Sequence, residues 1–153
     1  MSSPTQRLAD LALTLPTAPK PVAAYVPTVR TGNLVFVSGQ LPFAGGSLMA
    51  TGAVPTEVNL ETAQTCARQC VLNGLAALTG EIGSIDNVKR VVRVGCWVAS
   101  APGFGDQPKV ANGASELLVE IFGDAGRHAR AAVGSVALPL NTPVEIEFLF
   151  EVN

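Results

Sequence analysis

The stretch RHARAAVGSVALPLNTPVEIEFLFE, residues 127–151, contains the two patterns that decide the fold of this chain. From Ala129 to about Ala137 it is an almost uncharged run of small and β-branched residues, which predicts a strand. After the turn at Leu138-Pro139, apolar residues at every second position alternate with Glu145, Glu147 and their neighbours, which predicts another strand. One face of that second strand should pack against a core, and the face with the acids should be left to water or to a partner.

Two segments have the three- and four-residue spacing of amphipathic helices. The first predicts a helix from Asn59 to about Ile82, ended by Gly83-Ser84. The second begins after Asp106, a residue type that caps helix N-termini, and is closed by Gly123.

Strand-forming residues surround these helices. An extended arm, a turn at Thr31-Gly32-Asn33 and a strand from Leu34 to Ser38 predict a hairpin. A further strand is predicted over residues 88–98, with its core face formed by Val88, Val92, Val94, Cys96 and Val98. The order of elements predicts an α+β fold in which two helices pack on one face of a mixed β-sheet and the other face is bare.

With 153 residues, the chain is long enough for one ordinary domain. We expect residues 22–153 to form that domain. Residues 1–21 are expected to be an N-terminal extension, with a short helix over residues 4–13 followed by a proline-rich surface segment.

The composition limits the classes of function. Charged residues make up 14% of the chain, against roughly 25% in a typical soluble domain, so we expect an oligomer that hides part of its surface. The net charge of −2 argues against nucleic acid as a partner. There is no apolar run of membrane-spanning length and no basic leader, so we expect a cytoplasmic protein without a membrane partner.

The cysteines do not indicate a metal site. There are three, an odd number that suits a reducing compartment, and the chain has a single histidine. Cys66 and Cys70 are one helical turn apart and are expected to be small core residues. We therefore expect no metal site.

Arg130 and Glu145 are the main candidates for chemistry. A guanidinium in an apolar strand could pair with a neighbouring acid, or it could hold a substrate carboxylate through two parallel N–H donors. Glu145 could be a solvated strand residue, or, if oligomerisation covers its face, a general base that holds a water. Glu147 is a rival for that part, and the lone His128 is interpreted as structural.

Four stretches together resemble one family: GNLVFVSGQLPF, NVKRVVRVGCWVA, KVANGASELLVEIFG and ARAAVGSVALPLNTPVEIE. They are similar to the YjgF/RidA proteins, the reactive-intermediate enamine/imine deaminases, whose older label is endoribonuclease L-PSP. Arg130, Pro139 nine residues later and Glu145 fall in register with the family pattern. Many members carry a cysteine two residues after the arginine, where this chain has Ala132. The residues before the usual start and the segments ALTLPTAPKP and WVASAPGFGDQP indicate a divergent subgroup.

The resemblance implies a chorismate-mutase-like fold, assembled as a homotrimer with clefts between subunits. It implies hydrolytic deamination of 2-aminoacrylate-like imino acids to 2-oxo acids and ammonia, without a cofactor. Arg130 would bind the substrate carboxylate and Glu145 would hold the attacking water. The other substrate-binding residues implied by the resemblance are Tyr25, Ser38, Gly39 and Asn112.

Two alternatives stay open at this point. The first is a non-catalytic trimer that binds small carboxylates such as 2-oxo acids through Arg130. The second is an endoribonuclease or translation inhibitor, which is less favoured because an acidic chain with one histidine lacks a phosphate track and a paired acid and base.

Overall fold

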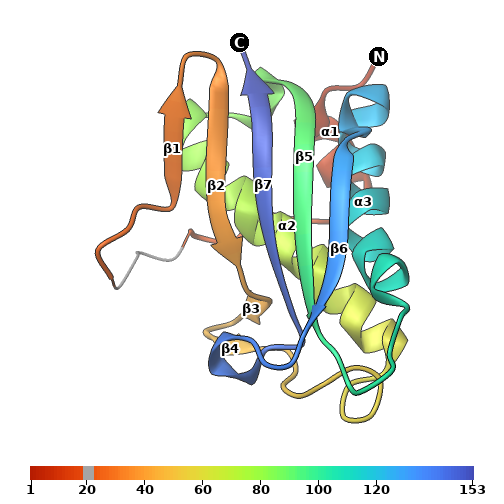
Figure 1. The fold of residues 1–153 in the computed structure, drawn as a ribbon. Coiled ribbons are helices and arrows are strands. Elements are labelled where there is room, and N and C mark those ends of the chain that lie inside the picture. The colour runs from red at the N-terminus through yellow and green to blue at the C-terminus, as the bar shows by residue number, and fades with distance from the viewer. Residues whose placement is uncertain (19–22) are drawn as a thin grey trace.

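The computed structural model describes residues 1–18 and 23–153, and its last strand lies in the middle of the sheet. The elements in chain order are α1 (Pro4–Asp10), β1 (Thr28–Thr31), β2 (Leu34–Gln40), β3 (Phe43–Ala44), β4 (Ser47–Leu48), α2 (Leu60–Ile82), the 3₁₀ turn η1 (Ile85–Asn87), β5 (Val88–Ala99), α3 (Gln107–Phe122), η2 (Gly123–Gly126), β6 (Ala129–Ser135), η3 (Pro139–Asn141) and β7 (Val144–Val152). Figure 1 shows this arrangement.

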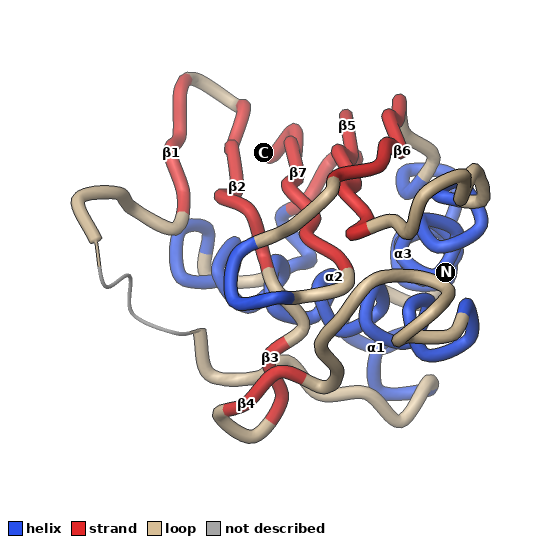
Figure 2. Tube along the Cα trace, turned by 60° about the horizontal axis from the view of Figure 1, so that its bottom comes forward, coloured by secondary structure: helices blue, strands red, loops and turns tan. Residues whose placement is uncertain are grey.

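The main sheet has five strands in the order β1-β2-β7-β5-β6. β5 and β6 run parallel, while the other neighbours are antiparallel, so the predicted mixed sheet is confirmed. α2 and α3 cover one face, and no helix among the described residues covers the other (Figures 1 and 2). β3 and β4 form a separate small hairpin beyond the end of β2.

β7 follows the predicted alternation along its whole length. Its core face, buried under the helices, consists of Val144, Ile146, Phe148, Phe150 and Val152. The other residues of the strand are only partly buried and face the open side of the sheet. Burial of five such side chains, worth roughly 1.5–3 kcal/mol each, fixes the register of the strand because a one-residue slip would expose them all.

The ends of the two long helices agree with the sequence in all but one respect. Asn59 caps α2 by accepting a hydrogen bond from the Thr62 N–H at 2.8 Å. Asp106 precedes α3 as predicted, but its side chain makes no capping bond. Its backbone (φ −93°, ψ 26°) is not extended as a capping residue requires, and its carboxylate instead lies 3.5 Å from Lys109 Nζ.

A bulge in β5 changes one part of the predicted core face. The register with β7 shifts between Val91 and Arg93, so Val91 is fully buried while Val92 is only partly buried. The prediction that Val92 faces the core is therefore wrong. A strict period of two cannot anticipate an extra residue in one strand of a pair.

The N-terminal residues pack on the domain. α1 is shorter than the predicted helix over residues 4–13, its Leu8 is buried in the common core, and the Thr5 N–H donates to Asp86 Oδ1 at 2.8 Å. The predicted boundary between the extension (1–21) and the domain (22–153) falls within residues 19–22, outside the described residues. None of the described helices is long and apolar enough to cross a membrane.

Two glycines test the packing of the helical layer. A Cβ added at Gly113 in α3 would collide with the Gln64 carbonyl oxygen of α2, whereas one added at Gly80 in α2 would meet nothing within 4 Å. Gly113→Ala should lower the free energy of unfolding by about 1–3 kcal/mol, because main chain cannot move aside cheaply. Gly80→Ala should raise it by about 0.5 kcal/mol through helix propensity alone. Urea unfolding at matched protein concentration measures both, and a Gly113→Ala variant as stable as the parent would contradict the close helix packing.

Candidate functional site

Arg130 lies on the edge strand β6, on the helix side of the sheet. Its neighbour on β5 is Val94. Val94 is buried and pairs in turn with Phe148 of β7. The guanidinium Nη1 donates to Asn112 Oδ1 at 2.8 Å and to Ser115 Oγ at 3.1 Å, both on α3. Among the described residues, Nε and Nη2 have no acceptor, so this side of the fork is open to an external anion.

His128 belongs to the same hydrogen-bond network. Its Nδ1 lies 2.6 Å from the Gly126 carbonyl oxygen, which can only accept, so Nδ1 carries the proton of the neutral ring. Nε2 then accepts from the Ser115 hydroxyl at 2.9 Å, and the Ser115 oxygen is left to accept from Arg130. Burial lowers the pKa of His128, the Gly126 bond raises it, and the nearby charge of Arg130 lowers it further.

The spacing in the sequence brings these four side chains together. Asn112 and Ser115 are three apart on a helix and share one face, while His128 and Arg130 are two apart in extended chain and share one side. Sequence reasoning missed Ser115 and gave His128 no part in a site. The paired spacings were the available signal, but only the packing of α3 against β6 shows that the two faces meet.

Glu145 lies on the other face of the sheet. It begins the exposed side of β7 and is paired with Trp97 of β5. A Cβ at Gly39 would collide with the Glu145 carboxylate, so the acid lies against the main chain of β2, where the register shifts between Val37 and Gln40. Burial raises the pKa of Glu145, and the neighbouring charge of Glu147 raises it further.

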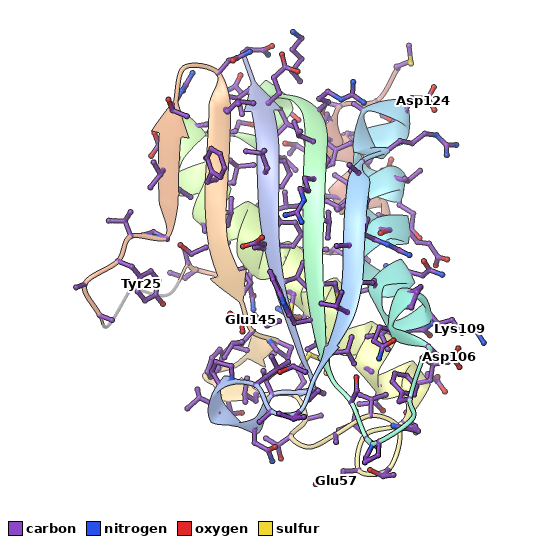
Figure 3. All side chains as sticks on the ribbon, in the orientation of Figure 1. Tyr25, Glu57, Asp106, Lys109, Asp124 and Glu145 are labelled. Atoms are coloured by element: carbon purple, nitrogen blue, oxygen red, sulfur yellow. The ribbon has the colours of Figure 1, made fainter. Side chains whose placement is uncertain are left out.

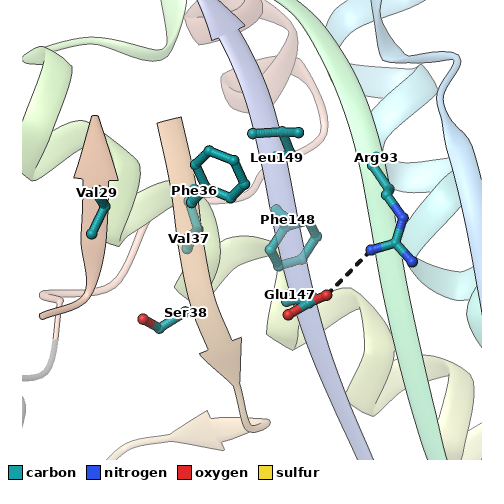
Figure 4. A pocket seen from close by; sticks show the side chains of 8 residues that line it. All are labelled: Val29, Phe36, Val37, Ser38, Arg93, Glu147, Phe148 and Leu149. Atoms are coloured by element: carbon teal, nitrogen blue, oxygen red, sulfur yellow. Dashed lines mark hydrogen bonds and ion pairs between the residues drawn. The ribbon is translucent and has the colours of Figure 1, made fainter. Parts of the chain in front are cut away.

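The two acids of β7 differ in their partners. Glu147 Oε1 lies 3.3 Å from Arg93 Nη1, in a hollow of about 230 Å³ on the open face of the sheet (Figure 4). Glu145 makes no ion pair with any described residue. Of the two rivals, Glu145 is therefore the carboxylate without a cation to neutralise it.

Tyr25, Ser38 and Gly39 line one cavity of about 630 Å³ beside the end of β2. The Ser38 hydroxyl donates to the Val26 carbonyl at 2.7 Å and its N–H donates to the Pro27 carbonyl at 2.9 Å. These two bonds attach the segment after Tyr25, at Val26 and Pro27, to β2. Tyr25 itself is 54% exposed, on the loop that precedes β1 (Figure 3).

The candidate residues thus form two groups. Arg130 and Asn112 lie together on the helix side of the sheet edge, and the Ser115–His128 pair supports them. The second group, on the open side near the end of β2, consists of Tyr25, Ser38, Gly39 and Glu145. One chain by itself does not bring Arg130 and Glu145 together.

The cysteines do not contribute to either group. Burial raises the pKa of the thiols of Cys66, Cys70 and Cys96, that of Cys96 to about 12, so they stay protonated. In the described part of the chain, no three His, Cys, Asp or Glu side chains are placed to hold a metal ion.

An open mixed sheet with two helices on one face is an α+β fold, and comparison with known proteins shows that it belongs to the chorismate-mutase-like class. The YjgF/chorismate mutase-like family model, whose description also carries an endoribonuclease label, matches residues 5–152. This chain belongs to that family. The match begins within the segment predicted as an N-terminal extension.

Individual relatives are similar over most of their length. Protein TCP17 of Trypanosoma cruzi is 40% identical over 147 residues, which cover 95% of this chain and 92% of that protein. A 2-iminobutanoate/2-iminopropanoate deaminase of Dermatophagoides farinae is 29% identical over 136 residues, which cover 88% of this chain and 91% of that protein. The crystal structure of the protein Atu1372 from Agrobacterium tumefaciens has a TM-score of 0.92 at 42% identity, covering 98% of this chain and 92% of that one.

The histidine provides a direct test of the Arg130 network. Because Arg130 lowers the pKa of His128, Arg130→Ala should raise it toward its ordinary value near 6.5. The chain has one histidine, so its imidazole resonances in an NMR pH titration need no further assignment. Arg127→Ala is the matched control, because Arg127 pairs with Asp124 and should leave the pKa unchanged. An unchanged pKa in Arg130→Ala, or an equal rise in both variants, would show that the network does not form.

Proposed function

We propose that this protein is a hydrolytic deaminase of small imine and enamine intermediates derived from amino acids, acting in clefts between the subunits of a homotrimer. The observation that carries the proposal is the Arg130 guanidinium. Nη1 is held by Asn112 and Ser115, and two further donors remain for the carboxylate of an imino acid or a 2-oxo acid. The deaminase of Dermatophagoides farinae supports the same reaction class.

A second copy of the chain would complete the site. Arg130 and Glu145 are on opposite faces of one sheet, so a substrate held by both must lie between two subunits. The open face also favours assembly, because Val29 and Phe36 are 54% and 48% exposed there beside Leu149. An apolar sheet face of this kind, on a chain poor in charge, is stabilised when another copy covers it.

The proposed reaction needs one positioned water. Glu145 takes a proton from this water as its oxygen attacks the imine carbon, and the C=N electron pair moves to nitrogen, which is protonated to give a carbinolamine. A second proton transfer makes the nitrogen a leaving group. Ammonia departs as the hydroxyl loses its proton and the C=O bond of the 2-oxo acid forms. An enamine is first converted to the imine by proton transfer to its carbon. No metal or organic cofactor takes part in the proposed reaction.

The raised pKa of Glu145 suits this part. A carboxylate whose pKa is raised by burial and by a neighbouring acid is a stronger base, so its ionised form accepts the proton of water more readily. Orientation of the imine by Arg130 supplies the remaining acceleration, because imines already hydrolyse in water and need only the correct alignment.

A non-catalytic carboxylate binder is the second candidate. It is favoured by one observation, namely that the Arg130 group is complete without Glu145, so a subunit could hold a 2-oxo acid without hydrolysing anything. The endoribonuclease label of the family has no such support, since the net charge of −2 does not favour RNA.

Two substitutions test the proposal. Arg130→Ala should raise KM about 100-fold, because the bidentate contact to the substrate carboxylate is lost. Glu145→Gln should lower kcat on the order of 100-fold with little change in the affinity for a 2-oxo acid. The measurements are the rate of loss of an imine generated in situ by an amino-acid oxidase, and calorimetry with the 2-oxo acid.

The controls are Arg127→Ala, a neighbouring exposed arginine, and Glu147→Gln, the acid already paired with Arg93. Both should have smaller effects than the variants they match. Loss of binding in Arg130→Ala without any catalysis in the parent would establish the binder instead. Imine hydrolysis that is insensitive to Arg130 would remove the proposed site.

A further inference from the structure

The cavity beside Gly39 extends well beyond the space that a three-carbon imino acid needs. Its volume of about 630 Å³ is within the range of roughly 300–1,000 Å³ that holds drug-sized ligands. Gly39 is part of its lining, and the Glu145 carboxylate lies against Gly39, so the cavity begins at the acid that would hold the water. The apolar side chains around it are Pro16, Pro27, Leu41, Phe43 and Leu140.

Three polar side chains of this cavity already form hydrogen bonds within the chain. The Ser38 hydroxyl donates to the Val26 carbonyl, and Gln40 Nε2 donates to the Ser38 carbonyl at 2.9 Å. Asn73 Nδ2 donates to the Leu41 and Phe43 carbonyls at 2.9 and 3.1 Å, and its Oδ1 accepts from Gln69. The surface left for a ligand is therefore mainly apolar, with the hydroxyls of Tyr25 and Thr17 at its side.

One wall of the cavity comes from the N-terminal segment. Pro16 and Thr17 line it, although the same segment begins with α1, which packs against α3 and η1. Leu8 is buried, and Leu13 and Leu15 are partly buried against the core, so the segment is held in place before it reaches the cavity. Thr17 is itself exposed, but it follows this held part of the chain and lines the apolar space, so the size of its side chain restricts what enters.

We infer that this cavity binds the side chain of the substrate, and that Thr17 is a specificity-determining residue which favours imino acids with bulky apolar side chains. The inference rests on the proposed function for the identity of the reacting group. Removing a branched aliphatic side chain from water into this space favours it over a methyl group, by about tenfold or more in kcat/KM. Arg130 of a second copy would hold the carboxylate, while the apolar part of the substrate would lie between Leu41, Leu140 and the N-terminal wall.

The experiment compares the imines derived from leucine and from alanine, each generated in situ by an amino-acid oxidase. The parent protein should hydrolyse the leucine-derived imine with a kcat/KM at least about tenfold higher. Thr17→Phe should fill part of the cavity and reduce the ratio of the two values about tenfold. Thr14→Phe, an exposed residue of the same segment outside the cavity lining, should leave that ratio unchanged.

A binding measurement separates this inference from the proposed function. Calorimetry with 4-methyl-2-oxopentanoate and pyruvate should show the same preference for the longer acid, and the same loss of preference in Thr17→Phe. If no imine is hydrolysed but this preference holds, the proposed function fails and the cavity assignment stands. Equal affinity for the two acids, or a ratio that Thr17→Phe and Thr14→Phe alter alike, would overturn the assignment.

Discussion

The structure depends on the two-residue period of β7 at the centre of the sheet. Glu145 and Glu147 must lie on the open face, because the residues that alternate with them are buried under the helices. These buried residues are Val144, Ile146, Phe148, Phe150 and Val152. The parallel pairing of β6 with β5 sets Arg130 on the opposite side, toward α3. The separation of the candidate base from the candidate anion-binding group is thus a direct consequence of packing the core, and it makes assembly a condition for the proposed chemistry.

The side chains of Arg130 and Glu145 are held in position by different physical interactions. Arg130 is fixed by directional hydrogen bonds that end at a main-chain carbonyl, in the order Arg130, Ser115, His128, Gly126. Glu145 is set by close approach, since the absence of a side chain at Gly39 allows the carboxylate to lie against the main chain. The cavity beyond Gly39 adds an apolar space. In the proposed function, the carboxylate, the reacting carbon and the side chain of an imino acid would each be held by a separate part of the surface.

The periodic parts of the fold could be predicted from the sequence. Both long helices, the hairpin at Gly32 and the alternation in β7 follow from spacing, because burial of one face dominates their energetics. The bulge at Val91–Arg93 and the missing side-chain cap at Asp106 could not be predicted, since each depends on local backbone angles that the residue types permit but do not require. The mixed pairing of the strands followed from the resemblance to a family and from the order of elements.

The candidate site was predictable in part. The pattern of residues left Glu145 and Glu147 as rivals because they share a face. The resemblance favoured Glu145, and the structure adds that Arg93 pairs with Glu147 while Glu145 lies against Gly39. Ser115 and His128 acquire their places through the packing of α3 on β6, which spacing within either segment cannot show. The contribution of Pro16 and Thr17 to the cavity was equally hidden, because it depends on where a proline-rich segment crosses the domain.

The central claim is that Arg130 and Glu145 act together across two copies of the chain, and subunit mixing tests it most directly. Arg130→Ala and Glu145→Gln chains, each strongly impaired alone when the substrate concentration is below KM, would be unfolded together in equal amounts and refolded into mixed assemblies. With sites shared between neighbouring subunits, about a quarter of them combine an intact arginine with an intact glutamate, so about a quarter of the parent activity should return. Mixed assemblies whose activity stays as low as that of either variant alone would contradict the account.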